Sequence, residues 1–182
     1  IPNFLSLLRI ALIPVVIVVS SQNWLYGNYL ACTLFLLASL TDFLDGYFAR
    51  NFNAMSKFGS LLDLIADKLL ITICLVWLLT IYQSIFMLIP TLIIISRELI
   101  LSSLREFFAY ENIKIEVSNL GKLKTTLQMI SVSILILAVN ENIIFQNLGI
   151  SCLWLASLLS VLSMINYFKY IFSLKKDISK GE

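Results

Sequence analysis

The feature that most constrains this chain is a series of six apolar segments, each close to the length of a membrane-crossing helix. They cover residues 4–20, 28–49, 59–81, 84–109, 123–140 and 147–172. A helix needs about 20 apolar residues to cross a bilayer, and inside lipid only helices and closed barrels satisfy the backbone. Hydrophobic residues make up 59% of the 182 residues and charged residues 13%, against about 25% charged in soluble domains. The sequence predicts an all-α, six-helix membrane bundle that forms a single domain over residues 1–182.

Basic residues are spread unevenly over the connections between these segments. The connections at 20–28, 82–84 and 140–147 contain no Lys or Arg, whereas those at 50–58 and 110–122 and the C-terminal end contain several. Lys and Arg gather on the cytoplasmic loops of membrane proteins. We therefore expect a multi-pass protein of the cell membrane with both termini, and these two connections, on the cytoplasmic side.

Four aspartates interrupt the apolar pattern of the second and third segments. They form the pattern D-x2-D-G-x2-A-R-x8-G-x3-D-x3-D, with Asp42, Asp45, Asp63 and Asp67 at its acidic positions. Spacings of three and four residues place each pair on one face of a helix. Two antiparallel helices joined by the 50–58 loop would carry all four to a similar depth, roughly 12 Å from the cytoplasmic helix ends. Four such carboxylates need cations, and oxygen ligands favour Mg²⁺, Mn²⁺ or Ca²⁺.

The residue types that are present narrow the chemistry further. The chain has no histidine and only three cysteines, Cys32, Cys74 and Cys152, which lie singly in apolar stretches. Histidine bases and cysteine–histidine metal sites are thereby excluded. Catalysis has to rely on carboxylates, Lys, Arg, Tyr, Ser or Thr. We expect no nucleic-acid partner.

Two hard cations held by shared carboxylates suit phosphoryl transfer, because they neutralise the phosphate oxygens. Gly46 and Gly59 would let a ligand approach the backbone, although Gly46 also suits close helix packing. Arg50 is either a phosphate partner or an anchor of the topology. Asn3 is expected to cap the first helix.

The aspartates have two alternative interpretations. In the first, they form structural ion pairs with Lys57, Lys68 or Arg97, but four carboxylates within 26 residues outnumber the cations near them. In the second, they line a pathway for cations, as carboxylates do in channels and transporters. A pathway would continue with polar residues to the outer face, where these segments carry Leu, Ile, Val, Phe and Trp. An enzyme with access from one side fits better.

The run from Asp42 to Asp67 resembles the signature of the CDP-alcohol phosphotransferases, with each fixed position and the eight-residue spacer intact. Members of that family are six-helix membrane enzymes that transfer a phosphatidyl or similar group from a CDP-linked donor to an alcohol and release CMP. The resemblance implies that Asp42, Asp45 and Asp63 bind two divalent cations, Mg²⁺ or Mn²⁺, and that Asp67 borders them and is the general base. It further implies donor-binding positions, which are Asn3, Gly46, Ala49, Arg50 and Gly59.

Three shorter stretches narrow the resemblance to one branch. IPNFLSLLRI at the start, SRELILSSLREFFA at 96–109 and LGKLKTTLQM at 120–129 resemble the bacterial phosphatidylglycerophosphate synthases. The acceptor of CDP-diacylglycerol would then be sn-glycerol 3-phosphate. Its phosphate requires cations, and the candidates are Arg97, Arg105, Lys122 and Lys124. For the two lysines, the alternative is that they anchor the helix at the membrane surface. This alternative applies above all to Lys124, which could point outward.

For Arg97, which lies deeper, an aspartate or the acceptor phosphate is the expected partner, since the adjacent Glu98 faces elsewhere on an ideal helix. Other acceptors remain as alternatives within the family: inositol phosphate, serine or phosphatidylglycerol. A cation transporter is the alternative outside it. The resemblance also implies a homodimer in contact with membrane lipid.

Overall fold

The computed structural model describes residues 2–22, 24–52, 57–110, 119–140 and 143–178, which form helices and short connections. The helices are α1 (Pro2–Ser21), α2 (Gly27–Phe52), α3 (Lys57–Tyr82), α4 (Ile85–Tyr110), α5 (Asn119–Leu137) and α6 (Ile143–Ile178). The prediction of an all-α chain with six helices is confirmed for these residues. Three stretches among them are long and apolar enough to cross a membrane: Ile85–Phe108, Leu120–Leu137 and Ile143–Lys169. The other three helices carry shorter apolar stretches.

The helices run further into polar sequence than the apolar segments suggested. α2 continues to Phe52, so Arg50 is helical and does not lie in a loop, and α6 extends from Ile143 to Ile178. The expectation that Asn3 caps the first helix is wrong, because α1 already begins at Pro2. Proline suits a first helical position, where its missing N–H is not needed. Hydropathy marks where lipid ends, and a helix can continue beyond that point.

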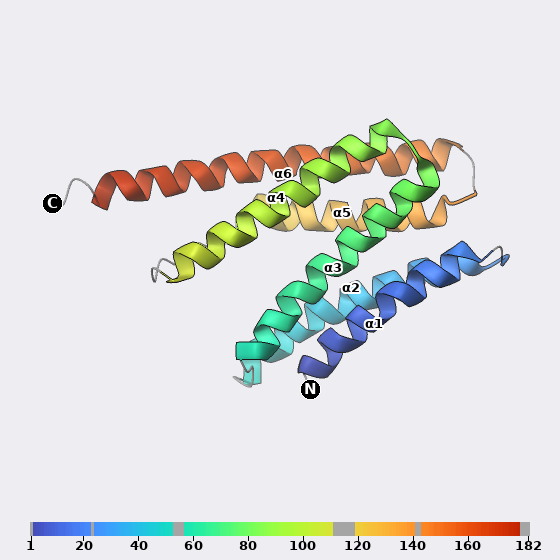
Figure 1. Cartoon of the computed structure of the whole chain (residues 1–182), viewed down its shortest axis with the longest axis horizontal. Helices are drawn as coiled ribbons and strands as arrows, with labels where there is room; N and C mark the ends of the chain where they lie inside the picture. Colours follow the sequence, from blue (N-terminus) through green and yellow to red (C-terminus); the bar gives the residue numbers. More distant parts are fainter. Residues whose placement is uncertain (1, 23, 53–56, 111–118, 141–142, 179–182) are drawn as a thin grey trace.

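Alternating helix directions bring the same kinds of helix end together (Figure 1). The start of α1, the end of α2, the start of α3, the end of α4, the start of α5 and the end of α6 all lie toward the left-hand side. The tight turn between α3 and α4 lies on the opposite side, where Gln83 takes a left-handed φ of 45° and its N–H donates to the carbonyl of Leu79. Each end of the bundle thus collects the connections predicted for one side of the membrane.

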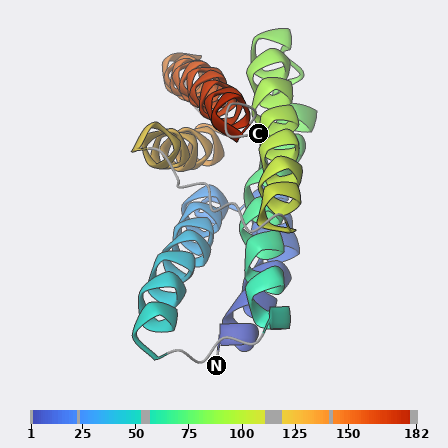
Figure 2. The same ribbon diagram turned by 90° about the vertical axis from the view of Figure 1, so that its left-hand side faces the viewer.

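The helices form two groups when the molecule is viewed along its long axis (Figure 2). α1, α3 and α4 lie on one side, and α2, α5 and α6 lie on the other. Among the described residues, α5 packs along α6, and α1 packs against both α2 and α3. α1 therefore contacts both aspartate-bearing helices.

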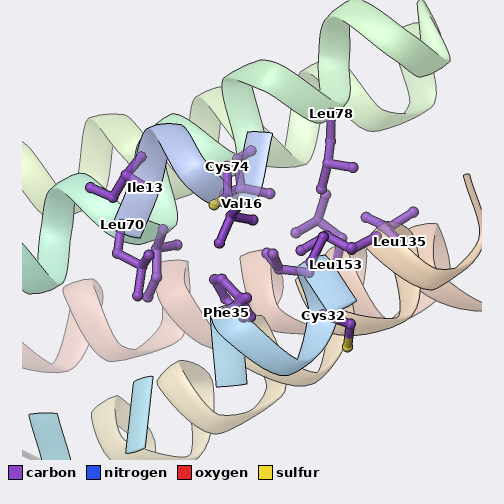
Figure 3. Close-up of a cluster of buried hydrophobic side chains, with 14 of the residues drawn as sticks. Ile13, Val16, Cys32, Phe35, Leu70, Cys74, Leu78, Leu135 and Leu153 are labelled. Atoms are coloured by element: carbon purple, nitrogen blue, oxygen red, sulfur yellow. The ribbon is translucent and has the colours of Figure 1, made fainter. Parts of the chain in front are cut away.

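A hydrophobic core joins the groups near the middle of the bundle (Figure 3). It contains Val16 of α1, Phe35 of α2, Leu78 of α3, Leu135 of α5 and Leu153 of α6, each fully buried. Cys32 and Cys74 also belong to this core and are free thiols. Both are buried, whereas Cys152 is only partly buried.

Side-chain hydrogen bonds to carbonyls fasten the end of the bundle opposite the aspartates. Asn28 Nδ2 donates to the carbonyl of Val139 at 2.6 Å, and the Tyr82 hydroxyl donates to that of Leu135 at 2.7 Å. Polar groups in lipid are strongly disfavoured unless they find such partners within the protein. These bonds link α2 to the turn that follows α5 and α3 to the last turn of α5.

Gly149 allows α6 to approach α5 closely. A Cβ at this position would lie 2.8 Å from both Cγ and Cδ2 of Leu135, and Ser131 Oγ donates to the Gly149 carbonyl at 2.8 Å. Small residues commonly permit such contacts between membrane helices. The α5–α6 pair therefore depends on the absence of one methyl group.

Gly149→Ala should lower the stability of the bundle by about 1–3 kcal/mol, the usual cost of overpacking a filled core. Thermal unfolding of the purified protein in detergent would measure the loss. Ser151→Ala, on an exposed position of the same helix, is the control and should change the melting temperature much less. An unchanged melting temperature in Gly149→Ala would show that Leu135 repacks without cost.

Candidate functional site

The backbone places the four aspartates on the two helices that the sequence predicted. Asp42 and Asp45 lie in α2, and Asp63 and Asp67 lie in α3. Because both stretches are regular helix, the spacings of three and four residues keep each pair on one helix face. The side chains of these aspartates lie outside the described residues. Their ligand roles therefore stay predictions.

The predicted donor-binding positions gather at the same end of the bundle. Asn3 lies in the first turn of α1, and Gly46, Ala49 and Arg50 lie in the last turns of α2. Gly59 lies near the start of α3 and is buried. Figure 1 shows these three helix ends on one side of the molecule. For the first four residues the side chains are outside the described part, so only their place along the helices is established.

A cavity of about 370 Å³ opens between α3, α4 and α5. Most of the described residues that line it are charged or polar; the lining consists of Lys68, Arg97, Glu98, Leu101, Ser102, Arg105, Glu106, Gly121, Lys124 and Thr125. Three of the four predicted acceptor-binding cations line it, and the fourth, Lys122, does not. The structure thus brings Arg97, Arg105 and Lys124 together from segments that are separated by up to 27 positions in the sequence.

Glu98 is the central anion of this cavity. Its Oε1 lies 3.1 Å from Arg97 Nη1 and also pairs with Lys124 Nζ. The expectation that Glu98 faces away from Arg97 is wrong. Consecutive residues do diverge by about 100° around a helix, but the long Arg97 side chain reaches back to its neighbour's carboxylate.

Arg97 is held by a second helix as well. Its Nη2 donates to Ser163 Oγ of α6 at 2.8 Å, and its side chain is only 6% exposed. Its Nε has no hydrogen-bond partner among the described residues. Arg97 is therefore a fixed, buried cation that still has donor capacity.

The two lysines at the start of α5 have opposite environments. The Lys124 side chain is 4% exposed and points into the bundle toward Glu98, whereas Lys122 is exposed. The alternative of an outward-pointing Lys124 is therefore wrong, and it is Lys122 that faces outward. Two residues on a helix differ in direction by about 200°, so only one of the pair can line the cavity.

Arg105 lies two turns beyond Arg97 on α4 and is more exposed. Its Cζ sits 5.8 Å from the centre of the Tyr167 ring of α6, which is within the range of a cation–π contact. Tyr167 is buried at 7% exposure. A fixed aromatic ring thus restricts where the exposed guanidinium can lie.

Lys68 connects the cavity with the aspartate helix. It follows Asp67 directly in α3, and its Nζ donates to Ser102 Oγ of α4, which in turn donates to the Glu98 carbonyl. The interpretation of Lys68 as only a structural ion-pair partner of the aspartates does not account for its contact with Ser102. A ligand in the cavity would therefore lie next to the segment that carries Asp67.

Several cavity residues were missed by sequence reasoning. Glu98, Ser102 and Glu106 lie four residues apart from one another within the stretch 96–109, which resembles the phosphatidylglycerophosphate synthases. That helical spacing was the available signal. For Lys68, the signal was its position one residue after an aspartate of the signature. For Tyr167 in α6, nothing in the local sequence points to the site.

The cavity has the charge of an anion-binding site. Its described lining includes four cations, which are Lys68, Arg97, Arg105 and Lys124, and two carboxylates, Glu98 and Glu106, so these described side chains have a net formal charge of +2. A phosphate monoester carries nearly two negative charges at neutral pH. The cavity can therefore neutralise one phosphate monoester.

Comparison with known proteins assigns the chain to a family. The sequence model described as CDP-alcohol phosphatidyltransferase matches residues 1–171. A CDP-diacylglycerol–glycerol-3-phosphate 3-phosphatidyltransferase of Rickettsia bellii is 46% identical over 127 residues, which are 70% of this chain and 69% of the relative. Proteins of the same description from Wigglesworthia glossinidia brevipalpis and Salmonella typhimurium are 39% and 38% identical over 130 residues, 70% of this chain and 71% of each relative. With a match that includes the aspartates, the cavity and Tyr167, this chain belongs to the CDP-alcohol phosphatidyltransferase family.

Proposed function

We propose that the cavity between α3, α4 and α5 binds the acceptor phosphate in the reaction that this membrane enzyme catalyses. That reaction is the transfer of a phosphatidyl group from CDP-diacylglycerol to sn-glycerol 3-phosphate, giving phosphatidylglycerophosphate and CMP. The relatives at 38–46% identity bear the name of this activity. The observation that carries the site assignment is the buried cation pair, Arg97 and Lys124, in a cavity whose described side chains have a net charge of +2.

The donor is proposed to bind at the neighbouring helix ends. Asp42, Asp45 and Asp63 would hold two divalent cations, Mg²⁺ or Mn²⁺, because an all-carboxylate donor set suits hard ions. When bound, such cations supply neutralising charge for the phosphate oxygens of the donor. Gly46, Ala49, Arg50, Gly59 and Asn3 are proposed to contact the nucleotide end. Their shared position at one end of α1, α2 and α3 supports this grouping.

Asp67 is proposed to accept the proton of the attacking hydroxyl. It is one residue from Lys68, which lines the phosphate cavity, so an acceptor held there by its phosphate would have its hydroxyl end near α3. The hydroxyl oxygen attacks the phosphorus of the phosphatidyl group, and the bond to CMP breaks. The residues of the cavity position the acceptor and keep its phosphate away from the reacting phosphorus.

All six helices are proposed to cross the membrane, with both termini and the site on the cytoplasmic side. The helix directions support this proposal. The end of α2, the start of α3, the end of α4 and the start of α5, which flank the Lys- and Arg-bearing connections of the sequence, lie toward one end of the bundle, as the positive-inside rule would require. Membrane lipid would then surround the exposed apolar side chains. A homodimer is proposed on the family resemblance alone.

The acceptor is tested by measuring CMP release from CDP-diacylglycerol with a panel of alcohols. Glycerol 3-phosphate should support turnover, while glycerol and serine should not, because they lack the phosphate that the cavity cations are proposed to bind. Turnover with inositol phosphate tests whether the enzyme recognises the alcohol part of the acceptor as well as its phosphate. Efficient turnover with uncharged acceptors would overturn the assignment of the cavity.

Divalent cations should be required for activity, since four carboxylates repel one another without them. Removing Mg²⁺ with excess chelator should abolish CMP release, and re-addition should restore it. Asp42→Asn, Asp45→Asn and Asp63→Asn should each raise the Mg²⁺ concentration needed for half-maximal activity and weaken donor binding. Full turnover in chelator would refute the metal proposal.

Asp67→Asn should lower turnover by about 10²-fold or more, the usual contribution of a general base, while donor binding is partly retained. The comparison of kcat with the binding of CDP-diacylglycerol separates the two effects. Turnover close to that of the wild type would exclude Asp67 as the base.

Lys124→Ala should raise the apparent KM for glycerol 3-phosphate by roughly 10- to 150-fold, because a charge-assisted hydrogen bond is worth about 1.5–3 kcal/mol. Lys122→Ala removes the same charge two residues away on an exposed position and should have little effect. Arg105→Ala should act in the same direction as Lys124→Ala, but less strongly because Arg105 is exposed. Equal increases of KM for CDP-diacylglycerol would indicate that these residues shape the bundle and do not bind the acceptor.

A further inference from the structure

Glu98 occupies the position on the cavity cations that an incoming phosphate would need. Its Oε1 pairs with Arg97 Nη1 and with Lys124 Nζ. The side chains of both cations are nearly buried, at 6% and 4% exposure, whereas that of Glu98 is 26% exposed. Glu98 is thus the most accessible member of this three-residue cluster, and all three residues line the cavity.

The cations cannot easily remain without an anion. Burying an unpaired charge costs several kcal/mol, and a buried pair is stable only when each member keeps its partner. Arg97 uses Nη2 for Ser163 and Nη1 for Glu98, and its Nε has no partner among the described residues. A phosphate that enters the cavity therefore has to share or replace the bonds that Glu98 makes.

We propose that Glu98 determines acceptor specificity by acting as an internal competitor for Arg97 and Lys124. This inference rests on the proposed role of the cavity as the site for the acceptor phosphate. A group with two negative charges outweighs one carboxylate and takes over both cations. A group with one charge gains no advantage over Glu98, and a neutral alcohol cannot compete. The residue thereby selects phosphate monoesters over acceptors that carry less charge.

A purely structural role makes the opposite prediction for a variant without the charge. If Glu98 only holds the two cations in place, Glu98→Gln disorders them, and anions bind more weakly. If Glu98 competes, Glu98→Gln frees the cations, and anions bind more tightly. The direction of the change separates the two roles.

The experiment uses the full chain in detergent and two inhibitors of CMP release that compete with glycerol 3-phosphate. Inorganic phosphate at pH 8 is mainly a dianion, and methanesulfonate is a monoanion. In the wild type, phosphate should inhibit and methanesulfonate should inhibit far less. In Glu98→Gln, both inhibition constants should fall, that of methanesulfonate by about 10-fold or more, in line with the loss of one charge-assisted competitor. The ratio of the inhibition constant of methanesulfonate to that of phosphate should therefore become smaller than in the wild type.

Two variants serve as controls. Glu98→Asp keeps the charge and should keep the preference for the dianion. Glu106→Gln removes a charge from the same cavity, but Glu106 is exposed and makes no ion pair with a described residue, so its inhibition constants should change much less. An equal gain in Glu106→Gln would show that total charge, and not the pairing of Glu98, governs binding.

Weaker inhibition in Glu98→Gln would overturn the proposal in favour of the structural role. If the variant is too unstable for kinetics, its thermal unfolding with and without inorganic phosphate decides the question. A competitor role predicts a larger upward shift of Tm by phosphate in Glu98→Gln than in the wild type, and a smaller shift contradicts it. Failure of phosphate to compete with glycerol 3-phosphate in the wild type would instead refute the cavity as the acceptor site.

Discussion

A polar group inside lipid has to find its partner within the protein, and this constraint organises the whole bundle. At one end, it is met by neutral bonds such as that from Asn28 to the Val139 carbonyl. Between α3, α4 and α5, it is met by ion pairs, where Glu98 balances Arg97 and Lys124. The first kind of partner is permanent, because a backbone carbonyl cannot leave. The second kind is a side chain, so in the proposed function a ligand can take its place.

Hydropathy and charge were sufficient to predict the number and approximate position of the helices. They failed at the polar helix ends, as for Arg50, because the pattern reports contact with lipid and a helix does not need lipid to continue. The aspartate pairs could be placed on α2 and α3 because spacing alone fixes a helix face. The packing of α1 against both α2 and α3 depends on contacts that no local pattern contains.

Sequence reasoning named three of the cations that line the cavity, Arg97, Arg105 and Lys124, but also Lys122, which does not line it. Lys122 and Lys124 are the same amino acid two positions apart, and the rotation of α5 about its own axis determines which of them lines the cavity. Glu98 was dismissed on ideal helix geometry, which ignores the reach of a long side chain such as that of Arg97. Charge balance offered a better guide, since two buried cations on neighbouring helices require an anion between them.

α6 carries none of the aspartates and none of the predicted acceptor cations, yet it holds both arginines of α4. Ser163 accepts a hydrogen bond from Arg97, and the ring of Tyr167 lies under Arg105. The two residues are four positions apart and therefore share one face of α6. Genetic variation in this helix is consequently hard to interpret from substrate contacts alone. If the arginines bind the acceptor as proposed, a substitution at Ser163 or Tyr167 would resemble a defect in substrate recognition. The altered side chain, however, would contact only the arginines and not the substrate.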